Sequence, residues 1–238
     1  MKVLVIIPAY NEEGNILNTC KSIDKIKDKI DFDLDYIVIN DGSIDNTEKI
    51  CIENKLPMIS LVHNLGIGGG VQTGYKYAYK NNYDIAIQFD GDGQHDANYI
   101  KNIVEPIVDG EANMVIGSRY VEELSEFKST KLRQLGITIL SFILKLTTGK
   151  KIYDMTSGFR AVDKDIIEIF AKDYPNDYPE PETNVEVVQK GFKVKEIPVK
   201  MHERLHGKSS ITPLKSIYYM IKVSYAMIVR SIIERRRK

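Results

Sequence analysis

The sequence predicts an α/β protein built on a mainly parallel sheet that helices flank. Short apolar runs alternate with segments of helical period through the first half of the chain, a pattern typical of parallel strands joined by crossover helices. The 238 residues, 43% of them hydrophobic, can bury one sizeable core. We therefore expect one Rossmann-like catalytic domain whose ligands gather at the carboxyl ends of its strands.

Each element follows from a local pattern. Apolar residues between positions 16 and 30 fall near one helical face, and Asp45 followed by Glu48 resembles a capping box that starts a second helix. Lys131 to Leu146 reads as a largely apolar helix, after which Ile152 to Ala161 returns to the core. The predicted strands are Lys2–Ile7, Tyr36–Ile39, Ile59–Val62, Ile85–Phe89, Met114–Ile116 and Val194–Val199.

Charge is distributed unevenly although the net charge is zero. From Lys200 onward there are ten Lys and Arg against two Glu, which leaves the preceding residues acidic. The basic residues alternate with long apolar runs, which favours an anionic membrane surface as partner and argues against nucleic acid. Within 213–233, Lys215, Lys222 and Arg230 form one narrow stripe on a helix, so this helix is expected to lie in the interface. Packing on its own domain or on a partner subunit is nearly as compatible with the pattern.

Cys20 and Cys51 lie in predicted helices and are expected to be core thiols. The apolar opening of the chain is too short for a secretory signal, so it reads as a first buried strand. We expect a cytoplasmic protein that works peripherally on the inner face of the cell membrane. Positions 1–210 are predicted to form the catalytic domain, with 131–148 as an interface helix and 211–238 as a basic amphipathic helix.

The strongest chemical signal is the segment from Gln88 to His95, where an apolar strand runs directly into Asp90 and Asp92. Hard divalent cations such as Mg²⁺ and Mn²⁺ take oxygen ligands and bridge the phosphates of a nucleotide. Two carboxylates at a strand end suit that task, and Gly91 between them allows close backbone approach.

Two further polar segments follow the first and second predicted strands. Pro8, Ala9, Tyr10, Asn11 and Glu12 come after the first, and a second segment from Asn40 to Thr47 includes Asp41 and Ser43. Because both lie at carboxyl ends of strands, they are expected to converge on one crevice, where Asp41 accepts hydrogen bonds from a base or ribose.

These three motifs, in this order, resemble glycosyltransferase family 2, which has the GT-A fold, a mixed and mainly parallel sheet. The sequence departs from the family pattern at Asn40, where an Asp is expected. Further segments resemble the polyprenyl-phosphate branch that includes dolichyl-phosphate mannose synthase: a Gly-rich turn from His63 to Gly70, then residues 154–160 and 203–209. The Gly-rich turn before a helix suggests a phosphate-binding nest.

The resemblance implies an inverting, metal-dependent enzyme that moves a hexose or hexosamine from a nucleotide-diphosphate sugar to a polyprenyl phosphate such as undecaprenyl phosphate, for cell-envelope glycan synthesis. It implies Mg²⁺ or Mn²⁺ held by Asp90, Asp92 and Gln94. Arg119 and Arg133 correspond to arginines that grip the acceptor phosphate, and Arg204 and Ser209 to a loop that closes over the donor. The donor-binding set is Pro8, Ala9, Tyr10, Glu12, Asp41, Ser43, Gly68, Asp90, Gly91, Gln94 and Ser209.

A phosphate acceptor is already a nucleophile at neutral pH, whereas a sugar hydroxyl acceptor needs a general base. Glu180 and Glu182 are the candidates for such a base, with Glu182 ranked as catalytic. Alternatively, Glu180 and Glu182 are solvated residues that cap the next helix and have no chemical role. Glu182 and Glu186 are one helical turn apart and are compatible with a pair that faces water.

Three alternatives stay open at this stage. The same fold can extend a cell-wall or capsular glycan directly, a similar core can transfer nucleotides, and a related chain can bind nucleotide sugars without turnover. The branch also leads us to expect a small membrane-protein partner or a homo-oligomer.

Overall fold

The computed structural model describes residues 1–121, 131–177, 179–202 and 213–236, and side chains in all of these except 131–135 and 213–219. Seven strands form one sheet: β1 (Lys2–Ala9), β2 (Asp33–Asn40), β3 (Met58–Ser60), β4 (Ile85–Gln88), β5 (Met114–Ser118), β6 (Arg160–Asp163) and β7 (Val194–Pro198). The helices are α1 (Ile16–Asp24), α2 (Thr47–Glu53), α3 (Gly66–Lys80), α4 (Ile100–Val108), α5 (Lys131–Thr148), α6 (Lys164–Lys172), α7 (Pro179–Gln189) and α8 (Pro213–Arg236), with short 3₁₀ turns at Lys27–Lys29 and Ala97–Tyr99.

The strands lie in the order β3-β2-β1-β4-β6-β5-β7. All neighbouring pairs are parallel except those of β6, which runs antiparallel to both β4 and β5. The mixed, mainly parallel sheet is therefore confirmed. The reversed strand β6 was not predicted, because its four residues lie within a stretch whose apolar character alone does not show direction.

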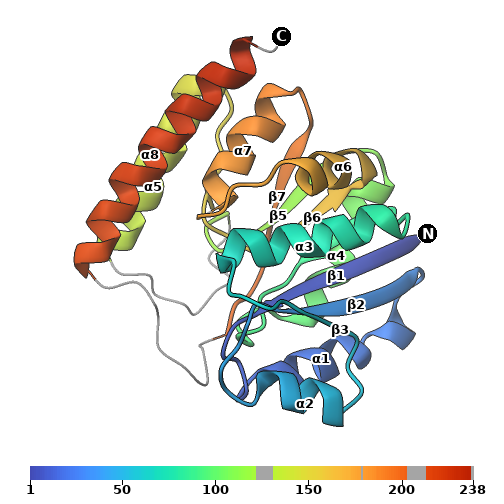
Figure 1. Ribbon diagram of the computed structural model, residues 1–238. Coiled ribbons are helices and arrows are strands. Elements are labelled where there is room, and N and C mark those ends of the chain that lie inside the picture. The colour runs from blue at the N-terminus through green and yellow to red at the C-terminus, as the bar shows by residue number, and fades with distance from the viewer. Residues whose placement is uncertain (122–130, 178, 203–212, 237–238) are drawn as a thin grey trace.

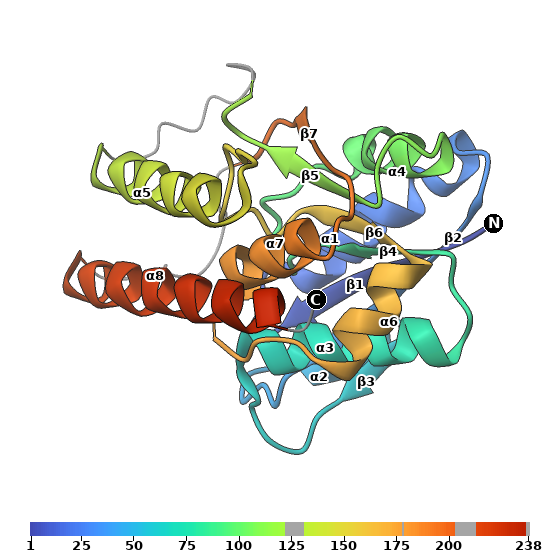
Figure 2. The ribbon, with the colours of Figure 1, turned by 90° about the horizontal axis from the view of Figure 1, so that it is seen from above.

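Alternate residues of each central strand enter opposite cores, as the period of two requires. On β1, Val3, Val5 and Ile7 pack with α1, α2 and α4, whereas Leu4 and Ile6 pack with α3, α6, α7 and the layer beyond. Helices thus cover both faces of the sheet, and α5 and α8 run side by side as an outer layer (Figures 1 and 2). This burial on both faces explains why the strands read as nearly continuous apolar runs.

Two local predictions need correction, and a third is confirmed. The first helix ends at Asp24 and continues as a 3₁₀ turn, so it is shorter than the apolar period suggested. The capping box does not form: Asn46 precedes α2, and the Asp45 carboxylate accepts the backbone N–H of Thr47, two residues on, at 2.9 Å. Cys20 and Cys51 are buried free thiols, as predicted.

The C-terminal helix α8 packs on α5 and α7 of its own chain. Val223 and Met227 are buried in the core. Two residues of the predicted basic stripe form ion pairs within the protein: Lys222 with Asp177, and Arg230 with Asp173 and Glu186. The side chain of the third, Lys215, lies outside those described. Other apolar residues of α8 remain exposed. In the described part of the chain, no helix has both the length and the apolar composition that crossing a bilayer requires.

Candidate functional site

Six chain segments meet at one edge of the sheet. Parallel β1, β2, β4, β5 and β7 all end there, and antiparallel β6 begins there, since Arg160 pairs with Gln88 at the end of β4 and with Ile116 on β5. This edge collects the three motifs found in the sequence, as the strand-end argument predicted.

The segments after β1 and β2 are joined by hydrogen bonds. Asn11 N donates to Ser43 Oγ at 3.0 Å, Ile44 N donates to Asn11 Oδ1 at 2.9 Å, and Glu12 N donates to Thr47 Oγ1 at 2.8 Å. Asn11 holds a left-handed backbone (φ 55°), which its short polar side chain tolerates. Ser43 and Glu12 therefore hold the two segments together, whereas Tyr10 stays exposed at their edge.

Asp41 occupies the junction between β2 and the start of α3. Its backbone N–H donates to Ala9 O, and its carboxylate accepts Leu65 N at 2.7 Å. Asn40, where the family pattern has Asp, is 1% exposed and binds Ser60 and the backbone of Ser43. Asn40 thus supports the turn, while Asp41 is the carboxylate held beside the end of β1.

The Gly-rich turn serves packing at the positions that were expected to cradle phosphate. Gly66 N donates to Asn64 Oδ1 and Gly68 N to Asn176 O, each at 3.0 Å. A Cβ on Gly68 would lie 2.0 Å from Pro175 O. The N–H of Gly68 thus has a protein acceptor and its α-carbon faces the chain at 175–176, and the contact of Gly68 with the donor stays a prediction.

Asp90 and Gly91 follow β4 and lie against the end of β1. Gly91 N donates to Pro8 O at 3.3 Å, and a Cβ on Gly91 would come within 3.0 Å of that oxygen. On the other side, a Cβ on Gly158 would lie 2.8 Å from Asp90 Oδ2. Two glycines therefore provide the room in which the Asp90 carboxylate lies.

Asp92 is 6% exposed, and its Oδ1 accepts the backbone N–H of Gln94 at 3.0 Å. The Gln94 side chain donates to His202 O at 3.4 Å, so the segment 200–202 lies beside the loop that carries Asp92 and Gln94. No group of three or more His, Cys, Asp or Glu side chains suited to a metal occurs among the described residues. Mg²⁺ is commonly held by one or two carboxylates together with substrate phosphates, so the hard oxygens of Asp90 and Asp92 fit such an ion.

His95 is a buried support of the same motif. Its Nδ1 accepts the backbone N–H of Asp90 at 3.1 Å, and its ring stacks on Phe159 with centroids 5.0 Å apart. Burial lowers the pKa of His95 to about 4, so the ring is neutral at pH 7. His95 therefore holds Asp90 in place as a hydrogen-bond acceptor.

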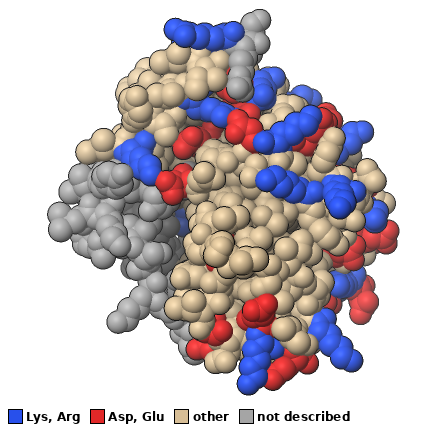
Figure 3. All heavy atoms as spheres, in the orientation of Figure 1, with Lys and Arg blue, Asp and Glu red and all other residues tan. Residues whose placement is uncertain are grey.

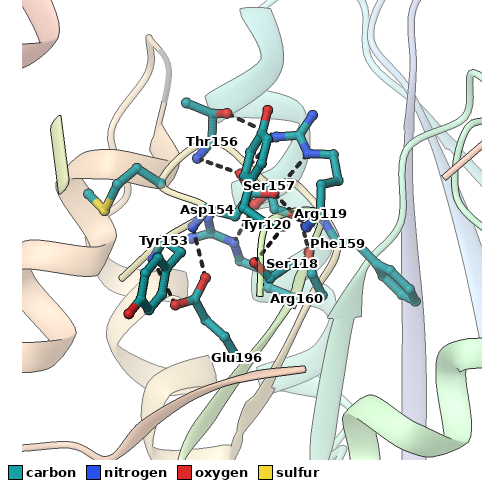
Figure 4. A network of polar contacts seen from close by, with 12 residues as sticks. Ser118, Arg119, Tyr120, Tyr153, Asp154, Thr156, Ser157, Phe159, Arg160 and Glu196 are labelled. Atoms are coloured by element: carbon teal, nitrogen blue, oxygen red, sulfur yellow. Dashed lines mark hydrogen bonds and ion pairs between the residues drawn. The ribbon is translucent and has the colours of Figure 1, made fainter. Parts of the chain in front are cut away.

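Arg119 follows β5 and belongs to a buried polar network (Figure 4). Its guanidinium donates to both oxygens of Asp154, and its Nη2 also donates to Thr156 Oγ1 at 3.0 Å. Burial disfavours the charged form, but the hydrogen bonds and charge of Asp154 outweigh it, so the pKa of Arg119 is raised. The charge of Asp90 also favours the charged form of Arg119, so this cation lies close enough to Asp90 to interact with it electrostatically.

A second arginine, Arg160, is completely buried beneath the same edge. It donates to Ser157 O and to Thr183 Oγ1, and its charge favours the ionised form of Glu180. Glu180 accepts a hydrogen bond from Gln88 Nε2 at 3.3 Å, and burial raises the pKa of its carboxyl. The sequence did not single out Arg160 for a role. The sequence did contain one signal: Arg160 is a charged residue within a stretch predicted to enter the core. A charge buried there needs polar partners, so Arg160 could have been expected to belong to a polar network.

Glu180 and Glu182 lie in different surroundings. Asp90 and Arg160 act on Glu180, whereas the charges nearest Glu182 include Arg230, Asp177 and Lys222 around α8. Glu186 is 1% exposed and binds Arg230, so the hypothesis that it faces water is wrong. Of the two candidate bases, Glu180 is the one whose carboxyl is acted on by the charge of Asp90.

Three predicted residues are not placed by these observations. Arg204 and Ser209 lie outside the described residues, and so does the side chain of Arg133, whose backbone lies in the first turn of α5.

The sequence is similar to those of known proteins. The model for "Glycosyl transferase family 2" matches residues 4–170. A UDP-N-acetylglucosamine–dolichyl-phosphate N-acetylglucosaminyltransferase of Methanococcus voltae is 35% identical over 188 residues, 71% of this chain and 72% of that protein. A polyprenol monophosphomannose synthase of Mycolicibacterium smegmatis is 26% identical over 236 residues, which are 94% of this chain and 86% of that protein.

A solved structure shares the fold. Glucosyl-3-phosphoglycerate synthase of Mycobacterium tuberculosis, crystallised with Mn²⁺, UDP-glucose and phosphoglyceric acid, superposes with a TM-score of 0.70 at 19% identity. The match covers 97% of this chain and 79% of that one. At this identity the likeness shows a common fold.

Proposed function

The chain belongs to glycosyl transferase family 2, and we propose that it transfers a sugar from a nucleotide-diphosphate donor to a polyprenyl phosphate, with inversion at the anomeric carbon. One observation supports this more than any other. Carboxylates suited to a metal–diphosphate complex, Asp90 and Asp92, and a buried cation suited to a phosphate, Arg119, follow strands that end at the same edge. The names of the relatives agree with an acceptor of this class.

The donor side of the proposal uses the segments after β1, β2 and β4. Asp41, fixed by the backbone of Ala9 and Leu65, is assigned to the nucleoside, and Asp90 and Asp92 are assigned to Mg²⁺ or Mn²⁺. When bound, the ion neutralises charge that develops on the diphosphate leaving group. His95, neutral and buried, keeps the Asp90 backbone in the required orientation.

The acceptor side uses cations, because two anions must approach one another. An oxygen of the acceptor phosphate forms a bond to the anomeric carbon while the bond from that carbon to the donor phosphate breaks, and nucleoside diphosphate leaves. Arg119 is assigned to the acceptor phosphate, and Arg133 is assigned with it by the family resemblance, which gives Arg204 to a loop that closes over the donor. A phosphate oxyanion has no proton to remove, so neither Glu180 nor Glu182 is needed as a general base. We assign Glu180 to contact the sugar instead, and we give Glu182 no chemical step.

A membrane surface is the proposed place of work. The outer layer exposes apolar side chains on both helices: Ile139, Phe142 and Leu146 on α5, and Ile221, Tyr225, Ile228 and Ile232 on α8. Figure 3 shows an uncharged patch at upper left, bordered by Lys and Arg side chains and by a few Asp and Glu. Contiguous apolar surface of this kind is typical of contact with lipid or protein. We propose that this layer lies on the inner face of the membrane, where a polyprenyl phosphate is accessible.

Transfer to lipid is tested with purified protein, radiolabelled nucleotide sugars, Mg²⁺ and undecaprenyl phosphate in detergent. A thermal-shift screen of UDP, GDP, CDP and dTDP sugars first selects the donor. The proposal predicts label that enters the organic phase only when the lipid is present, together with release of nucleoside diphosphate. Label found only on added glycan would instead support direct extension of a polysaccharide, and release of pyrophosphate would indicate nucleotidyl transfer.

A further inference from the structure

The segment between α5 and β6 carries Asp154, and its residues 150–159 belong to no helix or strand. Backbone N–H groups in such a segment need acceptors from elsewhere in the chain. Glu196 on β7 accepts two of them: Tyr153 N donates to Oε2 at 2.7 Å, and Asp154 N donates to Oε1 at 2.8 Å. The Glu196 carboxylate is thus a point at which this segment is held to the sheet (Figure 4).

Glu196 and Arg119 lie on neighbouring parts of the sheet. Strand β7 pairs in parallel with β5, and Glu196 lies opposite Ile116, three residues before Arg119. The side chain of Ser118, the residue next to Arg119, also hydrogen-bonds the Glu196 carboxylate. Thus β5 leads to the arginine, β7 carries Glu196, and the segment between α5 and β6 carries Asp154, which binds Arg119 at two atoms.

The carboxylate of Asp154 can orient Arg119 only while the backbone of Asp154 stays in place. A guanidinium that is held at two nitrogens follows the carboxylate that holds it. The residue whose side chain binds Arg119 is the same residue whose backbone N–H binds Glu196, so a shift of this backbone moves the guanidinium. A group anchored on a strand is placed more precisely than one anchored on a loop, and Glu196 supplies such an anchor.

We propose that Glu196 is a positioning residue, which sets the direction in which Arg119 meets the acceptor phosphate by holding Asp154. This inference rests on the assignment of Arg119 to that phosphate in the proposed function. Positioning and charge predict opposite effects here. Because Glu196 is an anion, removal of its charge alone would strengthen the binding of a phosphate, whereas loss of positioning weakens it.

The first test is steady-state kinetics of Glu196→Gln in the full chain with donor and undecaprenyl phosphate. Glutamine has one acceptor oxygen, so its amide N–H₂ faces one of the two backbone N–H groups, and the segment must shift. The KM for the lipid phosphate should rise about tenfold, as expected for loss of one charge-assisted hydrogen bond, while the KM for the donor changes less than about twofold.

Glu111→Gln is the matched control. It removes an exposed carboxylate that pairs with Lys195 of the same strand β7, and it should leave both KM values unchanged. An unchanged or lowered KM for the lipid phosphate in Glu196→Gln would overturn the proposal.

A second measurement does not depend on sugar transfer. In ¹H–¹⁵N NMR spectra, the Nε–H of Arg119 is identified by its absence in Arg119→Lys, and it should exchange slowly with water because it is buried and bonded to Asp154. Glu196→Gln should accelerate this exchange about tenfold or more, and Glu111→Gln should not. Unchanged exchange in Glu196→Gln would refute this inference even if transfer occurs. Accelerated exchange in a protein that transfers no sugar to lipid phosphate would refute only the proposed function.

Ser118→Ala provides a milder variant if Glu196→Gln does not fold. It removes one donor to the Glu196 carboxylate and leaves the two backbone hydrogen bonds in place. The exchange of the Arg119 Nε–H should then accelerate about threefold, in keeping with the loss of one neutral hydrogen bond. Absence of any acceleration would overturn the inference.

Discussion

The guanidinium of Arg119 is held at two atoms by the carboxylate of Asp154: Nε donates to Oδ2 at 2.8 Å and Nη2 donates to Oδ1 at 2.7 Å. Asp154 is completely buried and also accepts the backbone N–H of Arg119. The backbone N–H of Asp154 in turn donates to Glu196 at 2.8 Å. A planar guanidinium fixed at two nitrogens has one orientation, so this pair sets the direction in which Arg119 presents its charge.

We predict that Asp154→Asn lowers the free energy of unfolding by about 3 kcal/mol, because it leaves a buried guanidinium without its compensating charge. Urea denaturation measures this loss. Thr156→Val, which removes one neutral acceptor from the same guanidinium, should lower it by only about 1 kcal/mol. Similar stability of Asp154→Asn and wild type would show that the pair does not hold Arg119 in solution.

Asp92→Ala should abolish sugar transfer while the fold remains intact, since Asp92 is assigned to the metal and not to the apolar core. Excess chelator should do the same to the wild type. Asp96→Ala is the matched control: this carboxylate lies in the same loop but caps the 3₁₀ turn through Asn98 N, so its loss should affect stability by about 1 kcal/mol and leave transfer largely intact. Transfer by Asp92→Ala at the wild-type rate would refute the metal assignment.

Gly158→Ala should reduce kcat strongly. The added Cβ would lie 2.8 Å from Asp90 Oδ2 and 3.0 Å from Gln88 Nε2, so the carboxylate must move from its position beside Gly91. Overpacking of this kind typically costs about 1–3 kcal/mol of stability. Titration with Mn²⁺ and nucleoside diphosphate, followed by intrinsic fluorescence of the tyrosines, should show weakened metal binding. A variant with unchanged metal affinity and rate would mean that Asp90 tolerates displacement.

The buried pair of Glu186 on α7 and Arg230 on α8 is predicted to hold the outer helix in place. Arg230→Met should lower the free energy of unfolding by about 3 kcal/mol, because Glu186, 1% exposed, then loses its main counter-charge. Adding Glu186→Gln to that variant should recover part of the loss. A double-mutant cycle by chemical denaturation measures the coupling, and additive effects would argue against a specific pair.

The same carboxyl gives a pH dependence with a definite sign. Burial raises the pKa of Glu186 above its ordinary value of 4.5, although Arg230 and Lys190 oppose the shift. The folded chain therefore binds this proton more tightly than the unfolded chain does, and the resulting stability is lost as pH rises through the folded pKa. The unfolding free energy of wild type relative to Glu186→Gln should decrease as pH increases from about 4.5. A difference that increases with pH would contradict the raised pKa.

The edge of the sheet at which the segments after β1, β2 and β4 meet could be predicted, because the sequence patterns that indicate it are local. Each motif directly follows an apolar run, and parallel strands bring their carboxyl ends together whatever the rest of the chain does, so the segments that carry Asp41, Ser43 and Asp90 meet at one edge of the sheet, as expected. The antiparallel strand β6 and the buried Arg160 were missed. Four residues carry no signal of strand direction, and a buried arginine is recognisable only when its partners are known.

Pattern and spacing by themselves determined the α/β class, every strand of the described sheet except β6, and the edge at which the three motifs meet. Only the tertiary structure decided which charges meet. Glu180 and Glu182 are two residues apart, and since successive helical residues turn by about 100°, their side chains point in nearly opposite directions, one toward Asp90 and Arg160, the other toward Arg230. The position of α7 in the fold decides which of the two glutamates lies near Arg160 and which lies near Arg230. Contacts between residues far apart in the chain set that position.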